Sequence, residues 1–224
     1  MTKFLVLLIL LGLIPCGASV AAHADGRVAV FLPPKGAMGS EFMQLLDELD
    51  EMNIGVVVVS ESIGPYEFWE DSNEGAFSGA LQDFYKWTIT QTYEGLELEG
   101  YGAIIVGPGF AHTAWFGPSV SMARGYVEQA LELGMPVGGV SFGAAVVVSW
   151  GLLNGRSAAM PPYYQGVVIQ GSNKAYFLSE FPDVTFENTS LLVDLTDDLT
   201  PIVTARYGAI RKFAREIANL IQDD

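Results

Sequence analysis

Residues 139–143 read Gly-Val-Ser-Phe-Gly and match the pattern G-x-S-x-G, with Ser141 at the centre. In this pattern a tight turn between a strand and a helix lifts the serine side chain above the sheet, and glycines let backbone segments cross without a Cβ clash. The N-terminus of the following helix stabilises developing negative charge, and the N–H of Phe142 is placed to donate to an oxyanion. The pattern is typical of a serine nucleophile.

A nucleophilic serine needs a base, and this chain contains only two histidines, His23 and His112. An α/β-hydrolase has its catalytic histidine after the nucleophile in the chain, but no histidine follows His112. The ordinary Ser-His-acid order is therefore excluded. His112 follows an apolar run that predicts a strand, so we expect it near Ser141 at one edge of the sheet. It is a candidate base, although a lone loop histidine is more often a surface or packing residue.

The elements that would position these residues are predicted from apolar runs. The runs at 28–32 and 56–59 indicate buried parallel strands. Between them, Ser40 is a typical N-cap for a helix whose apolar face has three- and four-residue spacing and consists of Phe42, Leu45, Leu46, Leu49 and Met52. This βαβ unit predicts an α/β fold with a mostly parallel sheet, covered by helices on both faces.

The same alternation continues along the chain. Strands are predicted at 103–106, 137–140, 167–170, 191–195 and 202–205. Ser119 is expected to cap a helix before 137–140, and that strand runs directly into Ser141 and an apolar helix ending near Leu153. Asp197-Asp198 is expected in a hairpin turn rather than as a metal-ligand pair. An amphipathic helix with Ile210, Phe213, Ala214, Ile217 and Leu220 on one face closes the chain.

Residues 60–100 interrupt this regularity with aromatic side chains set among acidic residues and glycines. Residues 82–87 are expected to be helical, and residues 88–92 to form a strand. Two interpretations of this insertion remain open: it covers a pocket beside a strand end, or it is a packed surface excursion with its own aromatic cluster.

The first 24 residues have the pattern of a secretory signal peptide. Lys3 precedes an apolar stretch at 4–14, and Ala22-His23-Ala24 fits the small-x-small pattern before a cleavage site. We expect cleavage after Ala24, export of the protein, and a single domain at 25–224. An uncleaved anchor and a lipidated Cys16 are the alternatives. Cleavage would remove Cys16 and His23, leaving no thiol for a disulfide, a metal site or a nucleophile.

The charge balance excludes some partners. Removing Lys3 from the 11 basic residues leaves ten against 26 acidic ones, a formal charge of −16. Such a surface repels phosphate backbones and anionic lipid, so we expect no nucleic-acid partner and no membrane association after cleavage. The sequence contains no cluster with metal-ligand spacing and no phosphate-binding loop, so we expect no metal and no cofactor.

Three segments resemble the ThiJ/PfpI family of the class I glutamine-amidotransferase-like superfamily. They are Tyr-Gly-Ala-Ile-Ile-Val at 101–106, Pro-Val-Gly-Gly-Val-Ser-Phe-Gly at 136–143 and Gly-Leu-Leu-Asn-Gly-Arg at 151–156. Thr204-Ala205-Arg206 is similar to the family's usual ending, and the resemblance covers residues 28–221. It implies a flavodoxin-like three-layer sandwich with the nucleophile-elbow turn at the carboxyl edge of the sheet, and a possible homodimer.

The resemblance also implies roles for individual residues. Ser141 stands where the family has its nucleophilic cysteine, and Phe142 stands where a histidine often follows. Glu41 matches the acid that hydrogen-bonds the nucleophile. Residues 107–109 match the loop that supplies an oxyanion donor, but Pro108 has no N–H, which leaves the N–H of Gly109.

We therefore expect an exported ThiJ/PfpI-like protein, non-catalytic or weakly active, that binds a small molecule or a protein partner at the elbow pocket. The alternative is a serine-dependent hydrolase of peptidase or amidase type, in which Ser141 acts with Glu41 or His112 as its base. A serine hydroxyl without a base is a poor nucleophile, which favours the first interpretation.

Overall fold

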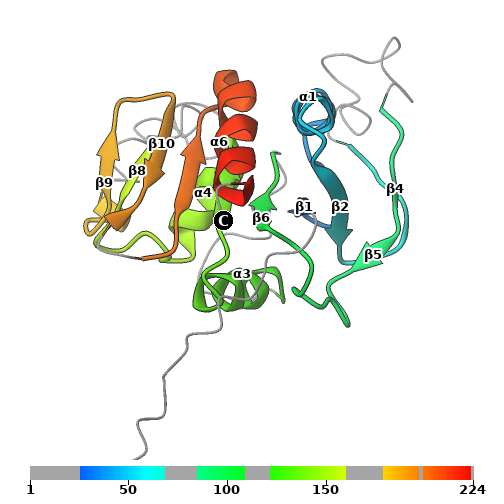
Figure 1. The fold of residues 1–224 in the computed structure, drawn as a ribbon, viewed down its shortest axis with the longest axis horizontal. Helices are drawn as coiled ribbons and strands as arrows, with labels where there is room; N and C mark the ends of the chain where they lie inside the picture. The colour runs from blue at the N-terminus through cyan, green and yellow to red at the C-terminus, as the bar shows by residue number, and fades with distance from the viewer. Residues whose placement is uncertain (1–25, 69–84, 109–121, 160–178, 197–198, 223–224) are drawn as a thin grey trace, which may run out of the picture.

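A computed structural model describes residues 26–68, 85–108, 122–159, 179–196 and 199–222 of the chain (Figure 1). Its centre is a sheet with the strand order β10-β11-β7-β6-β1-β2-β5. These strands are β1 (Arg27–Phe31), β2 (Gly55–Ser60), β5 (Gln91–Thr92), β6 (Ala103–Val106), β7 (Val137–Val140), β10 (Leu191–Asp194) and β11 (Ile202–Ala205). All neighbouring pairs are parallel except β10 and β11.

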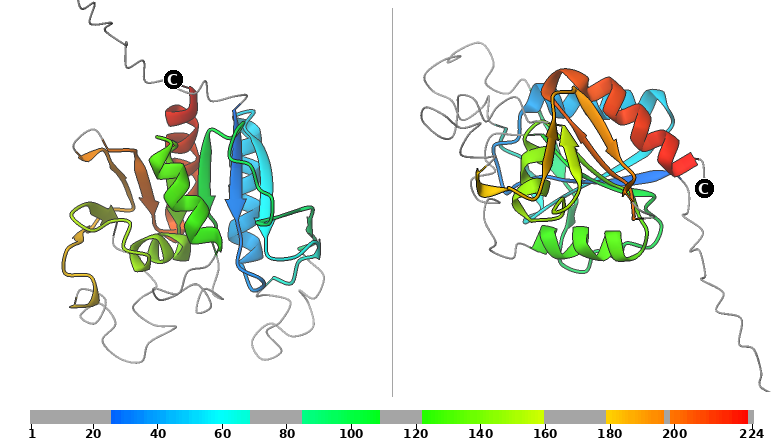
Figure 2. Two further views of the ribbon diagram at one scale, coloured as in Figure 1. Left: turned by 90° about the horizontal axis from the view of Figure 1, so that it is seen from below. Right: turned by 90° about the vertical axis from the view of Figure 1, so that its left-hand side faces the viewer.

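Helices cover both faces of this sheet, as the βαβ pattern predicts. On one face α1 (Gly39–Glu51) and α6 (Ile210–Gln222) bury Phe42, Leu45, Phe213 and Ile217 against Val28, Val30 and Ile105. On the other face α3 (Met122–Glu132) and α4 (Phe142–Ser149) bury Val127 and Val146 against Phe31 and Val106. Figure 2 shows these layers, with α1 and α6 across the sheet from α3. The α/β fold class expected from the sequence is confirmed.

Several predicted boundaries are wrong in detail. Helix α1 begins at Gly39 with Met38 as its N-cap, so Ser40 lies inside the first turn and does not cap it. Helix α4 ends at Ser149, and the residues up to Leu153 form turns. The strand predicted at 191–195 ends at Asp194, and its antiparallel pairing with β11 agrees with a hairpin. The expected strand at 167–170, the cap Ser119 and the pair Asp197-Asp198 lie outside the described residues.

The strand predicted at 88–92 is divided into two short strands. Strand β4 (Thr88–Ile89) pairs with β3 (Gly64–Pro65), whereas β5 pairs with β2. Residues 85–87 are not helical, contrary to prediction, and 82–84 lie outside the described residues. A further parallel pair, β8 (Ser157–Ala159) with β9 (Thr185–Glu187), is absent from the sequence-based expectations.

The described parts of the insertion pack against α1 and β1. Phe42 of α1 lies 5.5 Å, between ring centroids, from both Phe68 and Trp87. Tyr93 meets Phe31 edge-on, with 5.2 Å between ring centroids. For the described residues this agrees with a packed segment that has its own aromatic cluster.

Among the described residues, no helix is long and apolar enough to cross a membrane. The predicted signal peptide at 1–24 lies outside the described residues.

Candidate active site

Ser141 lies at the turn between β7 and α4, where the pattern G-x-S-x-G places it. Its backbone has φ 56° and ψ −117°, a left-handed conformation that residues other than glycine rarely adopt. Such a conformation costs on the order of 1–3 kcal/mol and persists only where the surrounding structure enforces it. The predicted elbow is therefore present in the backbone.

The glycines on either side of Ser141 are required by close backbone approaches. A Cβ added to Gly139 would lie 2.8 Å from Cα of Ala144, in the first turn of α4. A Cβ added to Gly143 would collide with the carbonyl oxygen of Val106, at the end of β6. These contacts give the physical reason for the glycine spacing and show that α4 starts directly against the neighbouring strand.

The N–H of Ser141 is already used by the sheet. It donates a hydrogen bond of 2.9 Å to the carbonyl oxygen of Ala205, which continues the pairing of β7 with β11. An anion at the elbow would therefore depend on N–H groups that follow Ser141, because the first turn of a helix has no intrahelical acceptors for its donors. Phe142, the expected donor, is the first residue of α4 and is buried.

The loop at 107–109, expected to supply the second oxyanion donor, lies only partly within the described residues. The N–H of Gly107 donates to the carbonyl oxygen of Phe31 at 2.9 Å, so it belongs to the sheet and not to an oxyanion hole. Pro108 has no N–H. Gly109 lies outside the described residues, and its expected role stays a prediction.

The side chain of Ser141 is enclosed and does not cap α4. Only 2% of the residue is exposed, and its hydroxyl makes no capping hydrogen bond. The expected hydrogen bond between this hydroxyl and the carboxyl group of Glu41 stays a prediction. His112 lies outside the described residues, so its expected role as a base also stays a prediction.

Glu41 lies in the first turn of α1 and is 3% exposed. Helix α1 follows β1 and α4 follows β7, so Glu41 and Ser141 both come after the carboxyl ends of parallel strands. Only β6 separates these two strands, which places their axes roughly 10 Å apart. The structure thus brings Glu41 and Ser141 to the same edge of the sheet, although α1, which carries Glu41, and α4, which follows Ser141, cover opposite faces.

The segment at 151–156 has a role that sequence reasoning missed. Nε of Arg156 lies 2.7 Å from Oδ1 of Asp194, and both side chains are buried. Arg156 also donates to the carbonyl oxygens of Asp194 and Thr200. The carboxyl of Asp194 accepts further hydrogen bonds from Ser157 and Thr196. A buried arginine beside β8 and a buried aspartate ending β10 form this bridge, and no local sequence pattern predicts the pairing.

The environment of Asp194 favours its charged form. Burial alone would raise the pKa of its carboxyl group. Hydrogen bonds from Ser157, Arg156 and Thr196 outweigh burial and hold the pKa below its ordinary value. This ion pair joins the segment after α4 to β10, which pairs with β11. Because β11 accepts the hydrogen bond from the N–H of Ser141, the ion pair helps to hold the strands beside the elbow.

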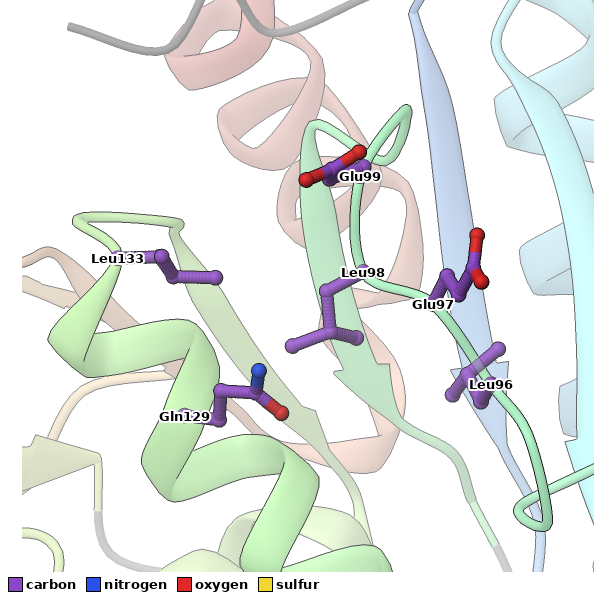
Figure 3. Close-up of a pocket in the computed structure, with 6 residues that line it drawn as sticks. All are labelled: Leu96, Glu97, Leu98, Glu99, Gln129 and Leu133. Carbon is purple, nitrogen blue, oxygen red and sulfur yellow. The ribbon is translucent and has the colours of Figure 1, made fainter. Parts of the chain in front are cut away.

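A pocket of about 430 Å³ lies away from Ser141 (Figure 3). Its lining residues are Leu96, Glu97, Leu98, Glu99, Gln129 and Leu133. They precede β6 and β7 in the chain, so the pocket is at the amino edge of the sheet, opposite the elbow. The carboxyl group of Glu97 points away from Gln129. In the described part of the chain, no group of three or more His, Cys, Asp or Glu residues could hold a metal ion.

No protein-family model and no curated protein matches this sequence. Solved structures do match. A ThiJ/PfpI domain protein from Brachyspira murdochii is 12% identical, with a TM-score of 0.68 over 90% of this chain and 99% of that one. DJ-1beta of Drosophila melanogaster is 16% identical, with a TM-score of 0.64 over 89% and 95% of the two chains. Oxidized DJ-1 of Toxoplasma gondii is 16% identical, with a TM-score of 0.61 over 89% and 92%. These likenesses show a shared fold.

Proposed function

We propose that this protein is an exported, non-catalytic or weakly active protein of ThiJ/PfpI-like fold that binds a small molecule or a protein partner at the elbow of Ser141. One observation carries the proposal. The backbone of Ser141 keeps the strained conformation of a nucleophile elbow, while a serine hydroxyl and not a thiol stands at its centre.

The identity of the residues at the elbow supports a lack of catalysis. In the proposed alignment with the ThiJ/PfpI family, Ser141 replaces a cysteine and Phe142 replaces a histidine. A thiol forms a nucleophilic thiolate far more readily than a hydroxyl ionises, so the replacement removes most of the reactivity unless a base is supplied. Pro108 further reduces the donors available to an oxyanion.

Retention of the strained turn supports binding. Backbone strain of this size lowers stability, and it concentrates at active sites and ligand clamps. A chain without a function at the elbow would gain stability by placing glycine at position 141. Export is part of the same proposal and rests on the signal-peptide pattern at 1–24.

Labelling with a fluorophosphonate probe tests the absence of catalysis. We expect no labelling of the purified protein at Ser141. Stoichiometric labelling that disappears in Ser141→Ala would overturn the proposal and establish the serine hydrolase in its place.

A thermal-shift screen with small polar molecules and candidate protein partners tests binding. We expect a stabilising compound or partner whose effect is lost in Ser141→Asn, because the substitution replaces the serine hydroxyl with a larger amide at the centre of the elbow. A compound that stabilises both proteins equally binds elsewhere and would count against the elbow as the site.

A further inference from the structure

The connection between β1 and α1, residues 32–38, is held by side chains from the insertion. The carbonyl oxygen of Leu32 accepts a hydrogen bond of 3.0 Å from the hydroxyl of Tyr93. The next carbonyl oxygen, that of Pro33, accepts two hydrogen bonds, 2.9 Å from Oγ of Ser60 and 3.0 Å from the hydroxyl of Tyr66. This connection leads directly to Glu41, in the first turn of α1.

Tyr66 is the residue that joins the two ends of this connection. Its hydroxyl donates to the carbonyl oxygen of Pro33 and accepts a 3.1 Å hydrogen bond from the N–H of Ala37. Burial raises the pKa of this hydroxyl above its ordinary value, against the opposing effect of the Ala37 N–H and with a further contribution from Glu67. The hydroxyl therefore stays protonated and keeps its role as a donor.

The proline pair makes this anchoring effective. Pro33 and Pro34 have fixed φ angles, so holding the carbonyl oxygen of Pro33 orients the chain that follows. The N–H of Gly36 is held in addition by the carbonyl oxygen of Glu67, at 2.7 Å. The connection is thus fixed at Pro33, Gly36 and Ala37, immediately before the helix that carries Glu41.

The aromatic ring and the backbone of Tyr66 are also held by contacts. It lies 4.9 Å, between ring centroids, from Phe68, which in turn lies 5.5 Å from Phe42 of α1. The N–H of Tyr66 donates to the carbonyl oxygen of Trp87 at 2.8 Å. Tyr66 therefore contacts the connection through its hydroxyl and α1 through neighbouring aromatic rings.

We propose that Tyr66 is a positioning residue for the elbow: its hydroxyl fixes residues 33–37 and thereby sets the place of Glu41 relative to Ser141. The insertion is then a functional part of the site and not only a packed surface segment. This inference rests on the proposed function, because it assigns the elbow of Ser141 as the site.

A thiol introduced at the elbow reports this coupling. In a Cys16→Ser background, Ser141→Cys provides the chain's only thiol, and its pKa is measured from the pH dependence of iodoacetamide alkylation. Three further substitutions are added singly: Glu41→Gln, Tyr66→Phe and Tyr101→Phe. Tyr101→Phe is the matched control, because Tyr101 precedes β6 at the amino edge of the sheet, opposite the elbow, and the substitution keeps the ring that lies by Arg27.

We expect Glu41→Gln to shift the thiol pKa by about one unit, and Tyr66→Phe by at least about half a unit, which is about threefold in thiolate population. Tyr101→Phe is expected to leave the thiol pKa unchanged. If Glu41→Gln shifts the pKa and Tyr66→Phe does not, the positioning role is wrong while the proposed site stands. If Glu41→Gln causes no shift, the two residues are not coupled and the positioning role of Tyr66 is wrong, whereas binding at the elbow is tested separately by the thermal-shift screen.

Ser60→Ala provides a milder variant if Tyr66→Phe does not fold. It removes one of the two hydrogen bonds to Pro33 and leaves the other. We expect a smaller shift of the thiol pKa in the same direction as in Tyr66→Phe. No shift in a folded Ser60→Ala protein, together with a shift in Glu41→Gln, would overturn the inference.

Discussion

The N–H of Ser141 donates a 2.9 Å hydrogen bond to the carbonyl oxygen of Ala205. This bond joins the elbow to β11, the last strand in the sequence. That strand, β11, pairs on its other side with β10, where Leu191 lies opposite Ala205. Strand β10 ends at Asp194, which forms the buried ion pair with Arg156. The backbone at Ser141 therefore depends on contacts that lie far from it in the sequence.

Replacement of Gly143 by alanine tests the contact between α4 and β6. The added Cβ would collide with the carbonyl oxygen of Val106, so we expect the free energy of unfolding to fall by about 3 kcal/mol. Urea unfolding followed by circular dichroism measures the change. Gly125→Ala is the control: the site, inside α3, is open, and alanine there should raise the free energy of unfolding by about 0.5–1 kcal/mol. Equal effects of the two substitutions would contradict the close approach.

The ion pair of Arg156 and Asp194 predicts a loss of stability in acid. Because the folded state holds the pKa of Asp194 below its ordinary value, its stabilising contribution is complete above about pH 5 and is lost as the pH falls through the folded pKa, below about pH 4. Asp194→Asn leaves Arg156 buried without its counter-charge, and we expect a loss of about 3–5 kcal/mol at neutral pH. The difference between wild type and Asp194→Asn, measured by urea unfolding, should shrink below about pH 4. A difference that is constant with pH would argue against the ion pair.

The hydrogen bonds of the Tyr66 and Ser60 hydroxyls predict a larger loss of stability in Tyr66→Phe than in Ser60→Ala. Tyr66→Phe leaves the N–H of Ala37 without its acceptor, so we expect a loss of about 1–3 kcal/mol. Ser60→Ala leaves the carbonyl oxygen of Pro33 with Tyr66 as its donor, so we expect a loss of about 1 kcal/mol or less. Thermal unfolding of both variants shows which of the two stability losses is larger. A larger loss in Ser60→Ala would show that Ser60 is the main anchor of the connection.

Much of the central architecture could be predicted because its signals are local. Apolar runs at 28–32, 56–59 and 137–140 indicate buried strands wherever they pack, and the glycines around Ser141 mark the elbow. The likeness to solved structures of the ThiJ/PfpI and DJ-1 type confirms the fold expected from three short segments.

The features that escaped prediction depend on partners distant in the chain. Arg156 and Asp194 each look like ordinary surface residues until β8 and β10 are placed side by side. Likewise, nothing near Tyr66 indicates that its hydroxyl contacts Pro33 and Ala37. Thr88 and Thr92 belong to different sheets because the sheet edge, and not local β-propensity, determines where each strand finds a partner.

The signal-peptide pattern predicts the N-terminus of the exported protein. With cleavage after Ala24, we expect the mature chain to begin at Asp25, because signal peptidases cut after a small-x-small pattern. Mass spectrometry of protein recovered outside the cytoplasm measures this directly. A mature protein that retains Lys3, or that carries lipid on Cys16, would contradict the prediction, and Ala24→Arg is expected to block cleavage.

Replacement of Ser141 by glycine tests whether the strained backbone of the elbow lowers the stability of the protein. Glycine adopts positive φ without a Cβ clash, so Ser141→Gly removes on the order of 1–3 kcal/mol of strain but adds about 0.5–1 kcal/mol of unfolded-state entropy. We therefore expect Ser141→Gly to raise the free energy of unfolding by about 1 kcal/mol, whereas Ser141→Ala keeps the strain. Asn53→Gly is the matched control, because Asn53 has φ 58° at the end of α1, and asparagine tolerates that region better than serine. If Ser141→Gly raises the free energy of unfolding more than Asn53→Gly does, the serine at the elbow lowers the stability of the protein, as residues at functional sites do. No gain would mean that serine is at least as stable there as glycine, and the argument from retained strain would fail.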